Sequence, residues 1–354
     1  MILLGLFIFL VIVGFFLKEN VFFNLLEILV LVVTVGISIN IADFAAYNSV
    51  YQYIGAGNFY PNTGVGWWFL CKLGNMAGMT YGQFKMAILL LGLLLIRSTI
   101  KYFTSNQNYI WSLYIIYPAI TDLIQIRFFM GIAIIIWAIK YLLRDTTKGY
   151  FIYCMLVIIA GQIHNSAYFY IFFIFWKIVI KNIRVTITML TVFLGICFAE
   201  KSILVNIISQ FGTGQENEFY LNNTLYQPTV SQTIFFSLMN AMFIVSAFYI
   251  RKSIILENQY DLIPKVEKNY LDFILAVDIM AIVIISMAMF SFTFFRLQKP
   301  LWILNFIDVA IYMTYVKKGK VSPGIIITIY AILGIIALIG TENLALHDFF
   351  GIQI

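Results

Sequence analysis

The chain has 354 residues, of which 62% are hydrophobic and only 11% are charged, with a formal net charge of +6. Soluble domains carry roughly a quarter charged residues, so this composition excludes an ordinary soluble enzyme or regulatory domain. Apolar runs recur along the whole sequence. We therefore expect an all-α fold, a single polytopic transmembrane domain over residues 1–354.

About twelve apolar segments are candidates for membrane-spanning helices, although some are shorter than the usual span of about 17 to 25 residues. The first, 2–17, has no basic region before it and no small-x-small cleavage site, which favours a retained helix over a signal peptide. The predicted spans are 2–17, 21–39, 81–96, 107–121, 125–143, 150–163, 165–180, 185–200, 232–250, 270–290, 300–316 and 321–340.

The basic residues lie in short clusters between the apolar runs, which indicates cytoplasmic loops and not a nucleic-acid interface. With both termini outside, 16 of the 22 Lys and Arg residues fall on the cytoplasmic side. This bias predicts a multi-pass membrane protein with long outer connections at about 40–80 and 201–231. The cytoplasmic group is Lys18, Arg97, Lys101, Lys140, Arg144, Lys148, Lys177, Lys181, Arg184, Arg251, Lys252, Lys265, Lys268, Lys317, Lys318 and Lys320.

The first outer connection begins with an acid and two aromatic residues at a spacing of four, Asp43, Tyr47 and Tyr51. This spacing places all three on one face of a helix lying on the membrane. Tyr60 follows in a turn-rich stretch, and Gly66-Trp67-Trp68 then predicts an interfacial or re-entrant segment up to about residue 78. The second outer connection contains Glu216 and Glu218 and is predicted to be exposed to solvent.

Two arginines stand on the outer side, where positive charges should be fewest. Arg127 opens a predicted span after Asp122 and Gln125, and Arg296 precedes Lys299 at an outer turn. Arg127 is either a residue that reaches the headgroups or pairs with Asp122, or part of a clamp for a phosphate group, since guanidinium binds anions through two parallel hydrogen bonds.

Acid–base chemistry has two candidates on the same side. His164 lies in the polar break Gly161-Gln-Ile-His164-Asn-Ser166, where it is either a hydrogen-bonded turn residue or a general base. Asp43 is either a helix cap, the partner of an arginine, or a base. Glu27, Asp278 and Asp308 lie within predicted spans, as hydrogen-bonding partners between helices or as part of a transport path.

Metal and cofactor chemistry has no comparable signal. Two histidines and the cysteines Cys71, Cys154 and Cys197 supply no convergent ligand set, and no P-loop, GxSxG or HExxH motif occurs. We expect no disulfide framework, no metal and no cofactor.

Five short motifs occur in a characteristic order. They are Asp43-Phe-Ala-Ala-Tyr47-Asn-Ser-Val-Tyr51, Gly64-Val-Gly66-Trp-Trp, Ile126-Arg127-Phe128, Ile163-His164-Asn165-Ser166-Ala167 and Phe295-Arg296-Leu297. Their order over nearly the whole chain resembles the EpsG-type branch of the Wzy polysaccharide polymerases. Phe128 stands where that family usually has glutamine, and the polar residue nearby is Gln125.

The resemblance implies a membrane glycosyltransferase, with a GT-C-like architecture, that joins undecaprenyl-diphosphate-linked oligosaccharide repeat units at the outer leaflet of a bacterial cell membrane. The product would be capsular, exo- or O-antigen polysaccharide. Its partners would be the lipid-linked oligosaccharide and the bilayer, with a flippase and a chain-length regulator as candidate partner proteins and no nucleic acid. The predicted site has His164 and Asp43 as catalytic residues; Arg127, Arg296 and Lys299 for the diphosphate; and Tyr47, Tyr51, Tyr60 and Gln125 for sugars.

Two other classes remain open. A flippase or transporter of the same lipid-linked oligosaccharide would place charged residues at midplane and use paired repeats, and no internal repeat is visible in the sequence. A membrane acyltransferase would use a histidine base, but it needs an acyl donor from the cytoplasm, and His164 is predicted to lie outside.

Overall fold

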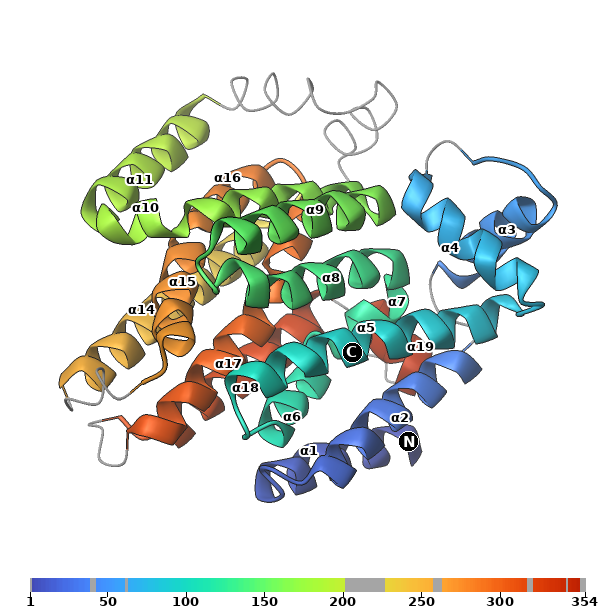
Figure 1. Ribbon diagram of the computed structural model, residues 1–354, viewed down its shortest axis with the longest axis horizontal. Coiled ribbons are helices and arrows are strands. Elements are labelled where there is room, and N and C mark those ends of the chain that lie inside the picture. Colours follow the sequence, from blue (N-terminus) through green and yellow to red (C-terminus); the bar gives the residue numbers. More distant parts are fainter. Residues whose placement is uncertain are drawn as a thin grey trace. The chain divides into compact units, whose positions relative to one another are not determined.

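The computed structural model describes residues 2–38, 43–60, 63–200, 227–256, 263–316, 321–341 and 343–350. The regular elements of these ranges are helices, which confirms the predicted all-α class (Figure 1). The chain divides into two compact units. Unit 1 comprises residues 1–174, 309–314 and 320–354, and unit 2 comprises residues 175–308 and 315–319.

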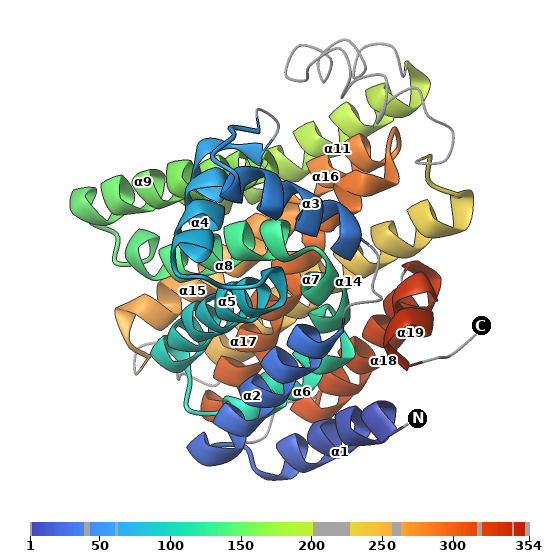
Figure 2. The same ribbon diagram turned by 90° about the vertical axis from the view of Figure 1, so that its right-hand side faces the viewer.

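Unit 1 contains most of the residues that the sequence singles out. Its helices α5, α8 and α9 pack side by side in that order, α4 lies against α9, and α3 packs on α4 (Figure 2). Its elements are α1 (Ile2–Phe16), α2 (Val21–Ile37), α3 (Phe44–Gly55), α4 (Val65–Met76), α5 (Tyr81–Phe103), α6 (Asn108–Ile116), α7 (Ala119–Ile124), α8 (Ile126–Leu142), α9 (Thr147–Ile163), the 3-10 helix η2 (Asn165–Phe175), α18 (Pro323–Thr341) and α19 (Asn343–Phe350).

Local sequence explains how α5 begins and how closely it packs. Thr80 and Gln83 form a capping box, in which each side chain accepts a hydrogen bond from the other residue's main-chain N–H. Further along α5, a Cβ at Gly92 would lie 2.3 Å from the ring of Phe129 on α8. A glycine at this position therefore lets the two helices approach closely, as small residues do between membrane helices.

Unit 2 is held together by aromatic and polar contacts between its helices. The rings of Phe236 and Phe295 stack with centroids 4.0 Å apart. Asn305 donates a hydrogen bond of 3.0 Å to the buried carboxylate of Asp278, which supports the predicted interhelical role of that acid. The elements are α10 (Trp176–Lys181), α11 (Ile183–Ala199), α14 (Val230–Leu256), α15 (Lys265–Met280), α16 (Ile282–Ala288), the 3-10 helix η6 (Phe292–Gln298) and the first part of α17 (Lys299–Tyr315).

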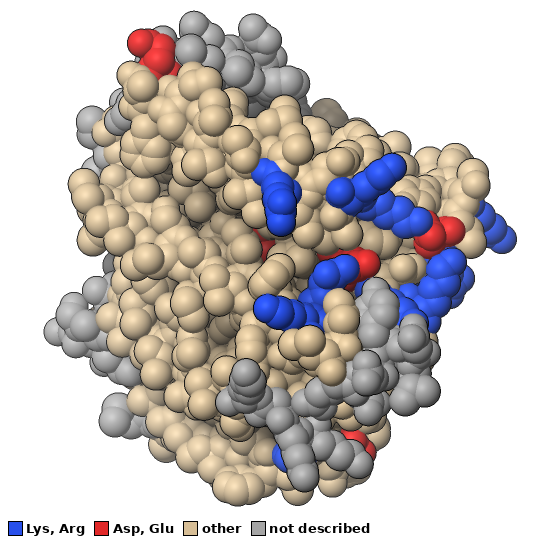
Figure 3. Space-filling view, turned by 90° about the vertical axis from the view of Figure 1, so that its left-hand side faces the viewer, with Lys and Arg blue, Asp and Glu red and all other residues tan. Residues whose placement is uncertain are grey.

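Charged side chains are unevenly distributed on the surface. On the face shown in Figure 3, Lys and Arg side chains gather in one region, and most of the remaining described surface is uncharged. Among the described residues of unit 2, the exposed basic side chains lie close to the ends of helices, and all of these belong to the predicted cytoplasmic group. They are Lys177, Lys181, Arg184, Lys252 and Lys265.

Four helical stretches of the described chain are long and apolar enough to cross a membrane: Tyr81–Phe103, Val230–Leu256, Lys265–Ala288 and Pro323–Gly340. Shorter apolar helices cover Ile2–Phe16, Val21–Thr34, Thr147–Ile163 and Ile183–Ala199. The helical and apolar nature of the predicted spans is therefore confirmed, whereas the count of twelve and the GT-C-like architecture stay predictions.

The predicted spans 107–121 and 165–180 differ from continuous α-helices, and 270–290 is divided at Ala281 into α15 and α16. The segment 107–121 is interrupted after α6, because Tyr117 is extended before Pro118, and proline disfavours the α conformation in the residue that precedes it. The segment 165–180 consists of η2 followed by the short α10. The predicted exposed stretch with Glu216 and Glu218 lies outside the described residues.

Candidate functional site

Three of the sequence motifs meet within unit 1, where α4 begins and α9 ends. Gly64 precedes α4 with φ 74° and ψ 146°, a conformation that is essentially restricted to glycine. A Cβ at Gly64 would lie 2.5 Å from the carbonyl oxygen of Gln162, and one at Gly66 would lie 3.0 Å from the same oxygen. The two glycines therefore allow the start of α4 to rest against the last turn of α9.

Arg127, the second residue of α8, joins the same place. Its Nε donates a hydrogen bond of 2.7 Å to the carbonyl oxygen of Ile163, the last residue of α9. Carbonyls at a helix end lack intrahelical partners, and they attract cations. One Nη of Arg127 is 3.8 Å from the position of a Cβ on Gly64. The guanidinium is thus directed into the junction of α4, α8 and α9.

His164 is the residue after Ile163, and its extended backbone ends α9. Its Nδ1 lies 2.6 Å from Oγ of Ser166 and 3.3 Å from the main-chain nitrogen of the same residue. The ring of Phe128 meets the imidazole edge to face, with centroids 5.3 Å apart. The phenylalanine that replaces the usual glutamine therefore contacts the candidate catalytic histidine.

Cys71, one turn beyond Trp67 on α4, is close enough to Arg127 for the positive charge to affect its thiol. Burial raises the pKa of the Cys71 thiol to about 12, and the positive charge of Arg127 opposes that rise. Cys71 is 1% exposed. A buried thiol that stays protonated is unsuited to nucleophilic work, so we assign Cys71 to packing.

Asp43 lies at the N-terminus of α3, with φ 65° and an exposed side chain. Asp43 occupies the N-cap position of α3, as the helix-cap alternative expected, but its side chain makes no capping hydrogen bond. The left-handed conformation is uncommon for residues other than glycine, although aspartate tolerates it better than most. The carboxylate of Asp43 is therefore held at the surface of the α3–α4 pair.

Tyr51 faces the protein and not the solvent. It is 1% exposed, its ring stacks on Phe84 of α5, and its hydroxyl donates a hydrogen bond of 2.9 Å to the carbonyl of Met79. Burial also raises the pKa of the Tyr51 hydroxyl. These contacts make Tyr51 a packing residue, whereas Tyr47 on the same helix is half-buried.

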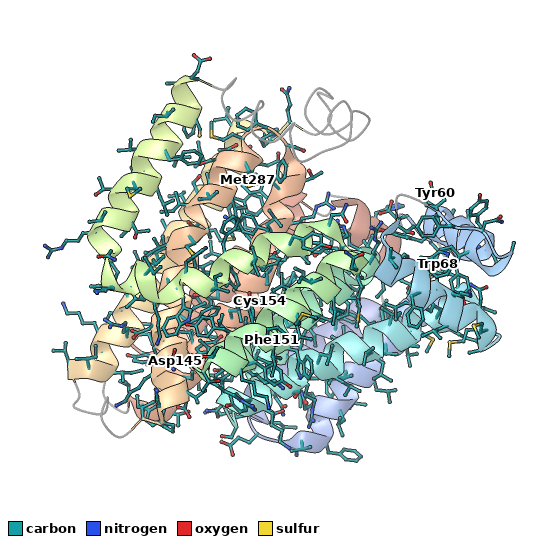
Figure 4. The ribbon with its side chains drawn as sticks, turned by 45° about the horizontal axis from the view of Figure 1, so that its top comes forward. Tyr60, Trp68, Asp145, Phe151, Cys154 and Met287 are labelled. Carbon is teal, nitrogen blue, oxygen red and sulfur yellow. The ribbon has the colours of Figure 1, made fainter. Side chains whose placement is uncertain are left out.

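Tyr60 belongs to a group of aromatic side chains beside the connection between α3 and α4, and Figure 4 labels it together with Trp68. Tyr60 is 38% exposed and meets Tyr53 edge to face at 6.0 Å. The rings of Phe59 and Trp68 are 5.8 Å apart, and the indole N–H donates to the carbonyl of Asn58. Lys72 lies 4.9 Å above the Trp68 ring. We call Tyr53, Phe59, Tyr60 and Trp68 the aromatic platform.

The remaining predicted site residues are Gln125 in unit 1 and Arg296 and Lys299 in unit 2. Gln125 is half-buried between α7 and α8, directly before the helix that carries Arg127. Arg296 and Lys299 belong to unit 2, where Arg296 Nε donates a hydrogen bond of 2.7 Å to the carbonyl of Thr293 and Lys299 is buried. Their predicted convergence with Arg127 stays a prediction. Among the described residues, no three His, Cys, Asp or Glu side chains form a group suited to a metal ion.

The order of these motifs agrees with a comparison at the level of protein families. A family model described as the EpsG family matches residues 20–349, nearly the whole chain. The chain belongs to the EpsG family. EpsG proteins are Wzy-type polysaccharide polymerases, so the resemblance expected from the motifs is confirmed. Neither a curated protein nor a solved structure shows a significant match.

Two features of this EpsG-family site were not anticipated from the sequence. One is the contact of Gly64 and Gly66 with Gln162, for which the Gly-x-Gly spacing before a helix is the sequence signal. The other is the identity of the partner of His164: a hydrogen-bonded turn was expected there, and Ser166 supplies the hydrogen bond. The signal for this partner is a serine two residues after a histidine at a helix end.

Proposed function

We propose that the chain joins undecaprenyl-diphosphate-linked oligosaccharide repeat units at the outer leaflet of a bacterial plasma membrane into capsular, exo- or O-antigen polysaccharide. Family membership supports a glycosyltransferase-type polymerase. The observation that carries the more specific proposal is the junction in unit 1. There, Arg127 donates a hydrogen bond to the carbonyl of Ile163, the residue before His164, and lies close to Gly64 at the start of α4.

The proposed reaction transfers the growing glycan to a single lipid-linked repeat unit. An acceptor hydroxyl attacks the anomeric carbon of the donor, and lipid diphosphate leaves with the electron pair of the broken bond. Negative charge develops on the leaving oxygen, and fixed cations stabilise it best when they are already oriented. Arg127 is our first such cation, with Arg296 and Lys299 as the second group, and the enzyme needs no metal in this scheme. Asp43 and His164 are the candidates for the base that accepts the hydroxyl proton.

The glycan is proposed to contact the aromatic platform. Exposed aromatic rings offer flat apolar faces, and the N–H of Trp68 is already bonded to Asn58, which fixes its ring. Tyr60 is the predicted sugar-binding residue that belongs to this group, and Tyr47 and Gln125 remain proposed contacts. Tyr51 is left out of the sugar site because its ring and hydroxyl are used within the protein.

The proposed membrane arrangement has both termini outside, about twelve helical segments in a GT-C-like architecture, and the active site on the outer face. A flippase would deliver the repeat units, and a chain-length regulator would end the growth of the polymer. The distribution of Lys and Arg along the sequence supports this orientation, since basic residues favour cytoplasmic loops.

The function is tested with the purified full chain in liposomes and a synthetic repeat unit on undecaprenyl diphosphate. A ladder of products that differ by one repeat unit is the expected result. A flippase would instead change the side on which the repeat unit is accessible without lengthening it. That outcome, without a ladder, would overturn the polymerase proposal.

The proposed clamp predicts that Arg127→Lys and Arg296→Lys each lower the rate of polymerisation by about 10²-fold, the typical loss on removing one oriented donor from a charge-stabilising site. Lysine keeps the charge but loses the planar pair of donors. Arg184→Lys, on an exposed residue of α11, is the matched control and should polymerise normally. Normal polymer length and rate in both test variants, at normal levels of inserted protein, would remove the clamp.

A further inference from the structure

The turn that follows α9 determines the hydrogen-bonding role of Nδ1 of His164. The main-chain N–H of Ser166 points at Nδ1 of His164, with the two nitrogens 3.3 Å apart, and Oγ of Ser166 lies 2.6 Å from the same atom. A serine hydroxyl can donate or accept, but a main-chain N–H can only donate. Nδ1 of His164 must therefore be the acceptor of at least the main-chain contact.

An accepting Nδ1 carries no proton. In a neutral imidazole one nitrogen donates and the other accepts, so the proton of His164 then resides on Nε2. The turn thus selects one tautomer, and in this tautomer the nitrogen that does not contact Ser166 is a hydrogen-bond donor. A neutral histidine of this kind has no lone pair on Nε2 with which to take a proton from a hydroxyl group.

The contact with Ser166 also disfavours a base role for His164. A general base becomes an imidazolium cation when it accepts a proton, and both nitrogens of an imidazolium are donors. Here Nδ1–H would face the main-chain N–H of Ser166, and the hydrogen bond between the two nitrogens would be lost. A donor role leaves the charge of His164 unchanged.

We propose, building on the polymerase function, that His164 acts through Nε2–H as a hydrogen-bond donor to the diphosphate of the lipid-linked donor substrate and does not act as the general base. As the bond between the anomeric carbon and the diphosphate oxygen breaks, its electron pair stays on that oxygen. Arg127 and His164 stabilise the charge together, and His164 keeps its proton. The acceptor hydroxyl forms the new bond to carbon, and its proton passes to a different base, for which Asp43 is the candidate.

The first test compares two replacements of His164 in the reconstituted assay. Glutamine places an amide N–H close to the position of Nε2 but is no useful base, whereas alanine provides neither function. The donor role predicts that His164→Gln stays within about tenfold of the unchanged protein while His164→Ala loses about 10²-fold or more. Equal loss in both variants, with both folded and inserted, would overturn the donor role.

The second test measures the tautomer and needs no activity. The chain has two histidines, so His347→Gln leaves His164 as the single histidine for ¹⁵N labelling in nanodiscs. The expected spectrum at pH 8 shows a protonated Nε2 and an unprotonated Nδ1, and Ser166→Ala, which keeps the main-chain N–H, should retain it. A protonated Nδ1 in the neutral ring would overturn the proposal. Should the chain prove to be a flippase, the Nε2–H tautomer would still be found, so the two failures are distinguishable.

Discussion

Position 64 places two requirements on its residue, and only glycine satisfies both. Its φ of 74° and ψ of 146° belong to a region that costs other residues about 1–3 kcal/mol. In addition, the carbonyl of Gln162 occupies the place where a side chain would begin. The backbone conformation concerns Gly64 alone. The lack of a side chain, in contrast, allows α4 to contact α9 beside Arg127.

Replacing Gly64 by alanine tests whether this contact matters for activity. Gly64→Ala should lower the temperature of half-inactivation and reduce polymerisation by at least about tenfold, because displacement of a catalytic group by about 1 Å is costly. Gly57→Ala is the matched control, since Gly57 also has a positive φ, of 91°, but nothing lies within 4 Å of its Cβ position. Equal losses in the two variants would attribute the effect to backbone strain alone.

Residue identities drew attention to Arg127 and His164 but did not predict their contacts. An arginine at the start of an apolar segment and a histidine in a polar break are unusual in an apolar chain, and both lie at the same junction. The sequence could not show that Gly64 meets Gln162, because residues almost 100 positions apart are brought together by helix packing, to which no local pattern corresponds. Tautomer selection at His164 depends on one hydrogen-bond direction, which a motif does not specify.

At the scale of elements, the α3–α4 pair has aromatic residues on both its protein-facing and its exposed sides. Tyr51 packs against Phe84 of α5, and Asn75 of α4 donates a hydrogen bond to the main-chain oxygen of Tyr51. Tyr53, Phe59 and Tyr60 of the platform are exposed, and Trp68 is half-buried. The inner aromatics fix the pair on the start of α5, and the outer ones are available to a ligand.

This division predicts opposite results for two tyrosines. Tyr51→Phe should lower the free energy of unfolding by about 1 kcal/mol, the usual value of one hydrogen bond, and leave polymer length unchanged. Tyr60→Ala should change stability by no more than about 0.5 kcal/mol, as exposed substitutions do, and shorten the polymer. Gel analysis of product length and thermal inactivation measure the two effects. Tyr102→Ala, similarly exposed at the far end of α5, is the control. Unaltered polymer length in Tyr60→Ala would exclude that residue from glycan binding.

Periodicity predicted the elements well but not always the direction in which they face. The spacing of Asp43, Tyr47 and Tyr51 indicated a helix, and α3 is that helix. The same spacing did not tell which of the three turns toward the protein, since this depends on where α5 lies. The break after α6 had a visible cause in Pro118, whereas the 3-10 form of η2 has no sequence signal that we recognise.

At the scale of the whole molecule, the orientation in the membrane depends on the distribution of basic residues. Loops rich in Lys and Arg stay in the cytoplasm, and the predicted arrangement places 16 of the 22 there. The α3–α4 pair and the turn at His164 would then both lie outside. The site can act at the outer leaflet only if this orientation in the membrane is correct.

Two engineered cysteines test this orientation after the three native ones are replaced by alanine. Asn58→Cys, in the connection after α3, should react in intact cells with a maleimide that does not cross membranes. Lys148→Cys, at the start of α9, should react only after the membrane is permeabilised. Both positions are exposed, so the side of the membrane decides the result. The reverse pattern would place the candidate site in the cytoplasm and exclude an outer-leaflet polymerase.

The junction in unit 1 is held largely through main-chain atoms. Arg127 donates a hydrogen bond to the carbonyl of Ile163, and Gly64 packs against the carbonyl of Gln162. Nδ1 of His164 accepts a hydrogen bond from the main-chain N–H of Ser166. Carbonyl and N–H groups are nearly the same whichever amino acid supplies them. Positions 162, 163 and 166 can therefore change during evolution while the geometry around the arginine and the histidine persists. Such a site can diverge toward new sugars and still be recognised only by short, degenerate motifs.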